Sequence, residues 1–233
     1  MNSIIDLAAE TSAKGTHTSA PRVIYNSAER YCTAQPNQIC FISDRQTMHL
    51  TMGSCISTVF IGKNGRYVLA ANHIIIAKAR EGSPAAKKGA QEQILEIIHR
   101  FESDFGITKE NIRCVHIIGG GTRHSDTSFK IHEENARETD LVLSSLGFRS
   151  ILIDTNSFIS AIFSVSRNNL SVFIEDTISK HHITYTLNID LLFSHCSQNQ
   201  LVPASALAPN NIEFEKLVAN GAIYGISGSR LRV

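Results

Sequence analysis

The chain has 233 residues, a length that suits one globular domain with extensions. Apolar residues make up 42% and charged residues 18%, a balance typical of a folded chain and not of a disordered one. The formal net charge of +1 supplies no basic field, so no nucleic-acid partner is expected. The longest mostly apolar run, 68–77, is about half of what a membrane span needs, so no membrane insertion is expected.

The cysteines and histidines do not form recognisable binding motifs. Five cysteines are an odd number and include no Cys-x-x-Cys pair, which argues against a disulfide framework and a zinc knuckle. None of the ten histidines stands at i, i+4 on a convincing helix, so no metal site is predicted. Residues 1–6 lack a positive n-region, so no cleavable signal peptide is expected. Together these features favour a reducing, cytoplasmic location.

The first part of the chain predicts an extension followed by strands. Residues 1–36 are rich in Ser, Thr, Ala and Asn without a sustained period and predict a mobile N-terminal extension. An apolar run over 55–61, an Asn64-Gly65 turn and a second run over 67–76 predict a β-hairpin. Further strands are predicted at 39–42, 47–52, 112–118, 150–154, 160–165 and 170–175.

Two stretches predict helices on the flanks of these strands. The first begins at Ser83-Pro84, with proline at the first helical position, and ends at Gly106. The second spans 131–146 and stops at Gly147. We therefore expect an α/β fold, a layered sandwich of mixed or antiparallel β-sheet flanked by helices.

The tail predicts a strand and a short helix. Residues 183–193 alternate well enough for one long strand, and Asn210 can cap a helix that continues through Val218. The expected organisation is an extension over 1–36, a domain over 37–180, and a C-terminal extension over 181–233.

Gly53-Ser54-Cys55 is the most informative motif in the chain. A cysteine directly after a Gly-Ser turn can present its sulfur beside exposed backbone N–H groups, and the hairpin folds His73 back toward it. A thiol beside an imidazole is the arrangement that activates a cysteine nucleophile. The turn also leaves the N–H of Cys55 available to an oxyanion, so Gly53 and Ser54 are expected to shape an oxyanion or substrate site. The alternative is a structural pair, a small buried cysteine and a satisfied histidine.

A glycine triplet follows the strand predicted at 112–118. Gly119-Gly120-Gly121 lacks the further glycines and the Lys-Ser/Thr of nucleotide loops. The triplet indicates instead a close approach of backbone to a neighbouring strand or to a substrate chain. Gly119 and Gly120 are therefore added to the expected oxyanion and substrate site.

In combination, these motifs resemble the chemoreceptor glutamine deamidases, the CheD family. The resemblance covers about 38–179 and rests on matches in the family's order: Thr51 to Cys55, Asn72-His73, Ile117 to Gly121, the helix with Asn135, and Asp154 after a strand. It implies a CheD-like fold, with Cys55 as the nucleophile and His73 as the general base and acid. No cofactor is implied.

The sequence departs from the family at three places. The family's supporting threonine, six residues before its cysteine, is replaced by His49, with Thr47 and Thr51 two residues to either side. These three share one strand face, so either an imidazole or a hydroxyl from that face is expected to orient His73. The hairpin is also one residue longer between Cys55 and His73, and the family's Gly-Gly pair after the aspartate appears as Asn156-Ser157.

The resemblance implies that the protein is an enzyme, a protein-glutamine glutaminase that acts on the cytoplasmic domains of chemoreceptors. A chemotaxis phosphatase of the CheC type is the implied regulatory partner. Two alternatives stay open at this point. One is a CheD-like effector or toxin deamidase that acts on another protein, and the other is a catalytically silent module that binds a signalling partner.

Overall fold

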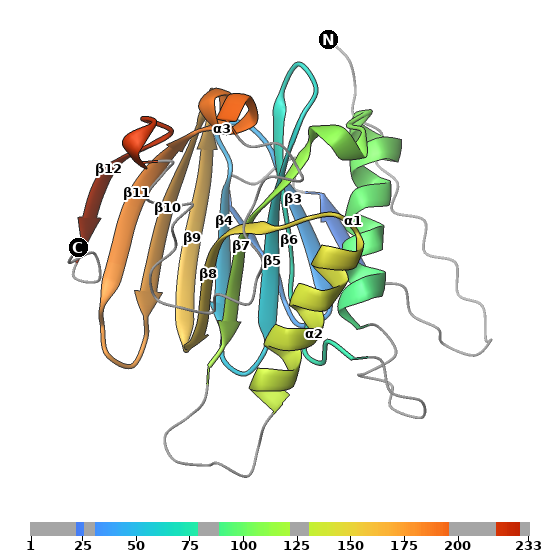
Figure 1. The fold of residues 1–233 in the computed structure, drawn as a ribbon, viewed down its shortest axis with the longest axis vertical. Helices are drawn as coiled ribbons and strands as arrows, with labels where there is room; N and C mark the ends of the chain where they lie inside the picture. Colours follow the sequence, from blue (N-terminus) through green and yellow to red (C-terminus); the bar gives the residue numbers. More distant parts are fainter. Residues whose placement is uncertain (1–21, 26–30, 79–88, 122–130, 196–217, 229–233) are drawn as a thin grey trace.

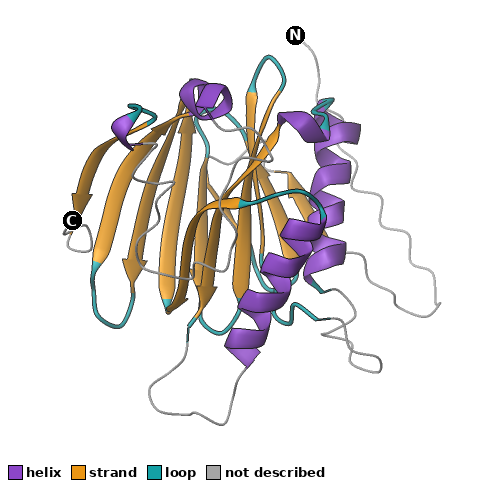
Figure 2. Ribbon diagram, in the orientation of Figure 1, coloured by secondary structure: helices purple, strands orange, loops and turns teal. Residues whose placement is uncertain are grey.

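The computed structural model describes residues 22–25, 31–78, 89–121, 131–195 and 218–228. In these residues two β-sheets pack face to face, and two long helices cover the outer face of one of them (Figures 1 and 2). The protein therefore has an α/β fold of mixed sheets and helices in layers, as the sequence predicts.

Each sheet has six strands. The first sheet runs in the order β1 (Arg22–Tyr25), β3 (Gln38–Ile42), β6 (Tyr67–Asn72), β5 (Ile56–Lys63), β7 (Ile112–Gly120) and β8 (Ser150–Ser157). The second sheet runs in the order β12 (Ile223–Gly228), β11 (His182–Asn188), β10 (Asn169–Asp176), β9 (Ile159–Ser166), β4 (Thr47–Met52) and β2 (Tyr31–Thr33). The pairs β1–β3, β7–β8 and β2–β4 are parallel and the other described pairs are antiparallel, so both sheets are mixed.

Three α-helices and one 3-10 turn complete the described elements: α1 (Ala90–Phe105), η2 (Lys109–Asn111), α2 (Ile131–Ser145) and α3 (Ile189–His195). The apolar stripe of α1 faces the first sheet and includes Ile94, Ile97 and Phe101. Gly106 ends α1 in the left-handed conformation, with φ 63°, and its N–H bonds Glu102 O. Both predicted helix stops, this one and Gly147, are confirmed, since Gly147 has φ 78°.

The inner strands of the first sheet, β3, β6, β5 and β7, are buried on both faces because their residues alternate between two cores. On β5, Val59 and Ile61 point to the core between the sheets, whereas Phe60 points to the core under α1 and α2. On β5 and β6, odd-numbered residues therefore face the core between the sheets, and even-numbered residues face the core under the helices. No helix in the described part of the chain is long and apolar enough to cross a membrane.

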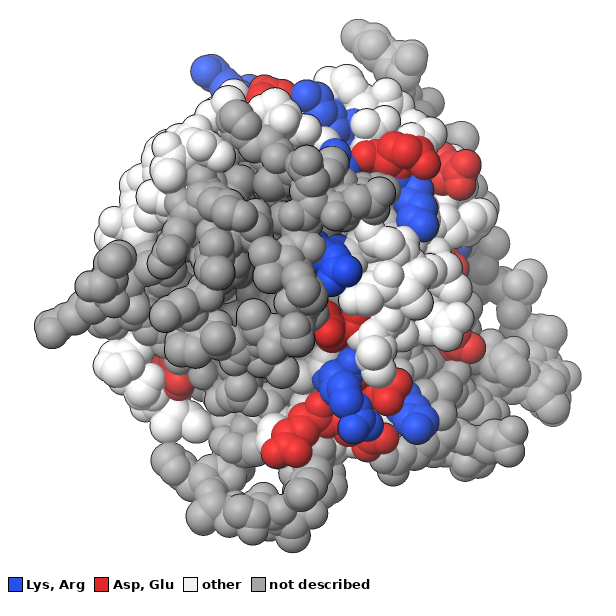
Figure 3. Space-filling view, viewed as in Figure 1, with Lys and Arg blue, Asp and Glu red and all other residues white. Residues whose placement is uncertain are grey.

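The outer charges of the helical side are mixed in sign. Figure 3 shows Lys and Arg beside Asp and Glu over the described part of this face. On α1, Arg100 Nε lies 2.7 Å from Glu96, and on α2, Arg137 lies 3.6 Å from Glu138. This arrangement agrees with the small net charge of the sequence.

Both ends of the chain differ from the sequence prediction. The predicted extension over 1–36 contains β1, which pairs with β3, and β2, which pairs with β4. The predicted strand over 183–193 ends at Asn188, because the Asn188 side chain accepts the N–H of Leu191 and caps α3. The first predicted helix is shorter than expected, because Gly89 is extended and α1 begins at Ala90. Ser83-Pro84 itself and the predicted cap at Asn210 lie outside the described residues.

Candidate active site

The Gly53-Ser54-Cys55 turn connects the two sheets at the lower end of the molecule in Figure 1, between β4 and β5. Two backbone hydrogen bonds from the end of β7 hold it. Gly120 donates its N–H to Cys55 O at 2.7 Å, and Gly121 donates to Gly53 O at 2.8 Å. The turn is therefore fixed on both sides of Ser54.

Gly119 allows this close approach of β7 to the turn. It has φ 100°, and a Cβ there would lie 2.4 Å from Cys55 O and 2.8 Å from Met52 Cβ. Of the two interpretations of the glycine triplet, the structure shows the approach to a neighbouring strand. The expectation that Gly120 serves an oxyanion is wrong, because its N–H is already bonded to Cys55 O.

The turn itself retains backbone donors. Within the described part of the chain, neither Ser54 nor Cys55 donates its N–H to another residue. The Cys55 side chain is partly exposed and packs on the rim of the core between the sheets. A thiol next to two uncommitted N–H groups is the arrangement that can hold the negative oxygen of a tetrahedral intermediate.

His73 lies on the same face of the sheet as Cys55. A bridge between Ile56 and Ile74 extends the β5–β6 pairing, so its register places His73 opposite Ser57 and diagonal to Cys55. Diagonal neighbours on one face lie about 7–8 Å apart between Cα atoms, within reach of an imidazole. The structure thus places Cys55 and His73, which the sequence predicts as the catalytic pair, on one face of the first sheet at the same end of the β5–β6 hairpin.

A backbone carbonyl orients His73. Its Nδ1 lies 3.0 Å from Ala34 O, and because a carbonyl can only accept, Nδ1 carries the proton. In the neutral ring Nε2 is then the basic nitrogen. Backbone bonds from Asn37 N–H to His73 O and from His73 N–H to Gln38 O fix the residue further. Sequence reasoning missed Ala34, because a backbone acceptor has no signature in side-chain identity.

Burial shifts both members of the pair toward neutrality. It raises the pKa of the Cys55 thiol, an effect partly opposed by the backbone N–H of Cys55 itself. It also lowers the pKa of the His73 imidazole, an effect partly opposed by the bond to Ala34 O. At neutral pH the resting pair is therefore a thiol beside a neutral imidazole.

The expected third member from β4 is not in the site. Met48, Leu50 and Met52 face the core between the sheets, so Thr47, His49 and Thr51 point to the opposite, outer face of the second sheet. There His49 Nδ1 lies 2.6 Å from Tyr31 Oη, and His49 Nε2 lies 2.9 Å from Ser160 Oγ. Thr47 bonds Ser164. The prediction that one of these three orients His73 directly is wrong, because their common face points away from Cys55.

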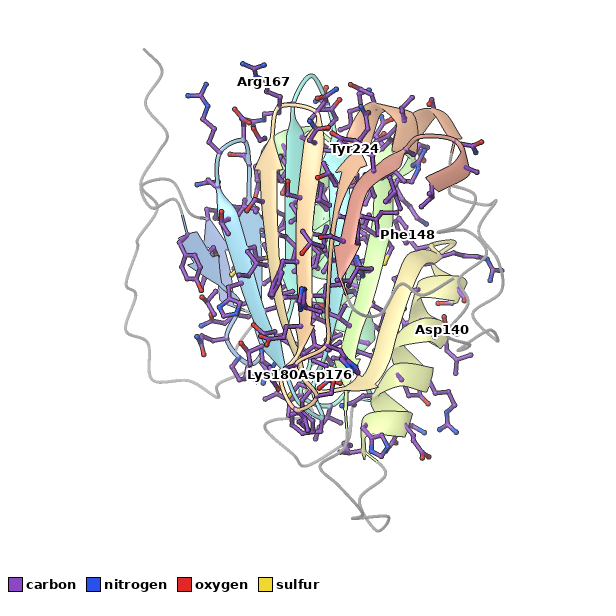
Figure 4. The ribbon with its side chains drawn as sticks, turned by 90° about the vertical axis from the view of Figure 1, so that its left-hand side faces the viewer. Asp140, Phe148, Arg167, Asp176, Lys180 and Tyr224 are labelled. Carbon is purple, nitrogen blue, oxygen red and sulfur yellow. The ribbon has the colours of Figure 1, made fainter. Side chains whose placement is uncertain are left out.

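Phe158 lies between the Gly53-Ser54-Cys55 turn, the nucleophile turn, and the turn that follows β10. A Cβ on Gly53 would lie 2.7 Å from the Phe158 ring, and Phe158 O accepts the N–H of Thr177 at 2.7 Å. Figure 4 shows Asp176 and Lys180 of this turn at the lower end of the second sheet. Ile178 of this turn is 47% exposed.

The described residues contain no group of three or more His, Cys, Asp or Glu side chains that could hold a metal ion. Comparison of the chain with models of known families and with curated proteins found no match.

Proposed function

We propose that the protein is a cysteine-dependent amidohydrolase that converts glutamine side chains of a protein substrate to glutamate. The observation that carries this proposal is the pairing of a partly exposed thiol, Cys55, with an imidazole on the same sheet face, His73, whose Nδ1 is held by Ala34 O. The N–H groups of Ser54 and Cys55, which donate to no other described residue, complete the set of groups that acyl transfer requires.

The first half-reaction forms a thioester. The Cys55 sulfur attacks the carboxamide carbon while His73 Nε2 takes the thiol proton, so that the neutral pair becomes charged only during attack. The N–H groups of Ser54 and Cys55 hold the oxyanion. His73 then gives its proton to the nitrogen that leaves, and ammonia departs.

The second half-reaction returns the enzyme to its starting state. His73 Nε2 takes a proton from water, whose oxygen attacks the thioester carbon. When the intermediate collapses, the carbon–sulfur bond breaks, the proton returns to the Cys55 sulfur and a glutamate side chain is released. The two half-reactions together consume one water molecule and release one ammonia molecule, and they need no other group from outside the chain.

The resemblance to the CheD family supports the choice of substrate. We propose the helical coiled-coil region of chemoreceptor cytoplasmic domains as the target and a CheC-type phosphatase as the regulatory partner. A partly exposed thiol on a turn between two strands suits a folded protein substrate, because the thiol is reached from the surface.

The test uses the full-length protein and purified receptor cytoplasmic fragments. Wild-type protein should release ammonia and leave the mass change of an amide-to-acid conversion in a receptor peptide, whereas Cys55→Ala and His73→Ala should not. Cys114→Ala is the matched control, because Cys114 is buried in the core under the helices. Deamidation by Cys55→Ala would reject the proposed nucleophile. Activity only on another protein would move the substrate assignment to an effector-like enzyme.

A further inference from the structure

The side chain of Asn135 ties three backbone groups of the site together from the buried face of α2. Its Nδ2 donates to Ser54 O at 3.0 Å and to Ile75 O at 2.9 Å, and its Oδ1 accepts the N–H of Ala77 at 2.7 Å. The side chain is fully buried. Both amide hydrogens and the amide oxygen are therefore used, and this pattern fixes the orientation of the amide.

The first of these contacts is made to the Ser54–Cys55 peptide, which carries the N–H of Cys55. Ser54 O and the N–H of Cys55 belong to one planar peptide, and in a trans peptide the two groups point in opposite directions. A donor that holds Ser54 O on the α2 side consequently holds the Cys55 N–H toward the opposite side. The same hydrogen bond polarises the peptide and strengthens its N–H as a donor.

The other two contacts are made to the segment that follows His73, the proposed base, in the sequence. Ile75 and Ala77 follow His73 by two and four residues, so the same amide also joins the segment of His73 to the turn of Cys55. We propose that Asn135 is a positioning residue that aims the Cys55 N–H at the developing oxyanion and fixes this donor relative to His73. The inference rests on the proposed acyl-transfer function and specifies how its oxyanion site is built.

Two variants and one matched control separate positioning from folding. Asn135→Ala removes all three contacts, and Asn135→Asp keeps the shape and the acceptor for Ala77 N–H but loses both donors. Thr139→Val is the control, because Thr139 lies one turn further along the same buried face and its hydroxyl has no partner among the described residues. Each Asn135 variant should lower kcat by about 100-fold or more with little change in KM, as the loss of one oxyanion donor does. Thr139→Val should keep the wild-type kcat.

Two further readouts distinguish a positioning role from a merely structural one. Alkylation of Cys55 by iodoacetamide involves no oxyanion, so both Asn135 variants should react within about threefold of the wild-type rate. A buried carboxyl titrates above its usual range, so the ratio of Asn135→Asp to wild-type kcat should rise as pH falls from 8 to 6, when the acid regains one O–H donor. An unchanged kcat, or a loss of kcat matched by an equal loss of alkylation, would overturn the inference.

A peptide that carries an aldehyde in place of the glutamine carboxamide separates this inference from the proposed function. Its adduct with the Cys55 sulfur places an oxygen at the oxyanion position. If wild-type protein binds the aldehyde and the Asn135 variants bind it at least tenfold more weakly, the positioning role stands even where no glutaminyl substrate is turned over. Equal aldehyde affinity in all variants overturns the role. If the wild-type protein neither binds the aldehyde nor releases ammonia, both proposals are overturned.

Discussion

The charge state of Cys55 and His73 decides how the pair can react. Burial raises the thiol pKa and lowers the imidazole pKa, so a resting thiolate–imidazolium pair is disfavoured from both sides. The pair therefore resembles a serine–histidine pair, in which the base takes the proton during attack, more than a preformed thiolate. The physical causes are the partial burial of Cys55 on the rim of the inter-sheet core and the burial of His73, which is 7% exposed.

This charge state predicts the pH dependence of the reaction. His73 must be neutral to act as a base, and its pKa lies below the ordinary 6.5, so kcat/KM should fall on the acid side with a midpoint below pH 6.5. The thiol pKa lies above 9.0, so alkylation of Cys55 by iodoacetamide should still be rising at pH 9. Rates measured from pH 5 to pH 10 check both. An alkylation rate that is already constant at pH 6 would show a preformed thiolate instead.

At the residue scale the sequence predicts the pair but not its support. Cys55 and His73 could be placed together because the Asn64-Gly65 turn sets the register of the hairpin, and β5 and β6 pair as expected. Ala34 could not be found, because a carbonyl oxygen is common to every residue. Alternation along β4 predicts that His49 shares a strand face with Thr47 and Thr51. Whether that face points to the core or to the outside depends on the side of β4 on which the other sheet packs, and the sequence does not show this.

At the scale of elements, the end of β7 is the support of the nucleophile turn. Gly119→Ala should displace this turn, since a Cβ there would meet Cys55 O and the left-handed conformation costs an alanine about 1–2 kcal/mol. We expect deamidase activity to fall below detection and the free energy of unfolding to fall by more than that conformational cost. Gly147→Ala is the matched control, because Gly147 also has a positive φ but no atom lies within 4 Å of the added Cβ. Chemical denaturation and ammonia release measure the two effects, and equal losses in the two variants would refute the support by β7.

Strand β2 is a second supporting element, because it leads directly to Ala34. Its pairing with β4 is reinforced on the outer face by the contacts of His49 with Tyr31 and Ser160. His49→Ala removes both contacts and should loosen the position of Ala34 O, with a several-fold loss of kcat, the size expected for one hydrogen bond of about 0.5–1.5 kcal/mol. Thr51→Ala, an exposed substitution on the same face, should leave the rate unchanged. Single-turnover rates of the two variants check this, and equal rates would mean that Ala34 is held without the His49 contacts.

The elements that the sequence misses are those whose formation depends on distant partners. Strands β1 and β2 have four and three residues, too few for a period to show, and they form because β3 and β4 offer them an edge. Strand β11 stops at Asn188 because its side chain caps α3, a signal that the alternation of 183–193 conceals. The long hairpin and α2 carry their own periodicity or turn residues, and their prediction is confirmed. The prediction of α1 is confirmed for Ala90–Phe105 and for its stop at Gly106, but not for a start at Ser83-Pro84, because Gly89 is extended.

At the scale of the whole molecule, the site depends on the packing of the two sheets. The nucleophile turn runs from β4 in the second sheet to β5 in the first. The His73 ring bonds Ala34 O, just after β2, and Ile75 O bonds Asn135 of α2. Any loosening between the sheets would therefore separate the groups of the site. Lys63 and Tyr67, which bond Asp190 at 2.7 Å and 2.5 Å, hold α3 to the far end of the β5–β6 hairpin.

The stability of this inter-sheet core should depend on pH through His116. This buried histidine bonds Tyr185, and its Nδ1 has no partner among the described residues. Burial lowers the pKa of His116 to about 3. In the unfolded chain the ring titrates near 6.5, so the unfolded state binds more protons between these values and stability must fall as pH falls through them. Between pH 7 and pH 4 the loss from this group is on the order of 3 kcal/mol.

Replacement of the titrating group tests this dependence independently of activity. His116→Phe and His116→Gln each remove the ionisation, so their free energies of unfolding should fall less between pH 7 and pH 4 than that of the wild type, by on the order of 3 kcal/mol. The comparison uses the change with pH and not the absolute stability, because either substitution also alters packing against Phe163, whose ring lies 5.6 Å from the imidazole. Urea denaturation of the three proteins at the two pH values supplies the three changes that are compared. Parallel pH profiles in all three proteins would mean that His116 keeps an ordinary pKa, and that the two sheets do not exclude water from its ring.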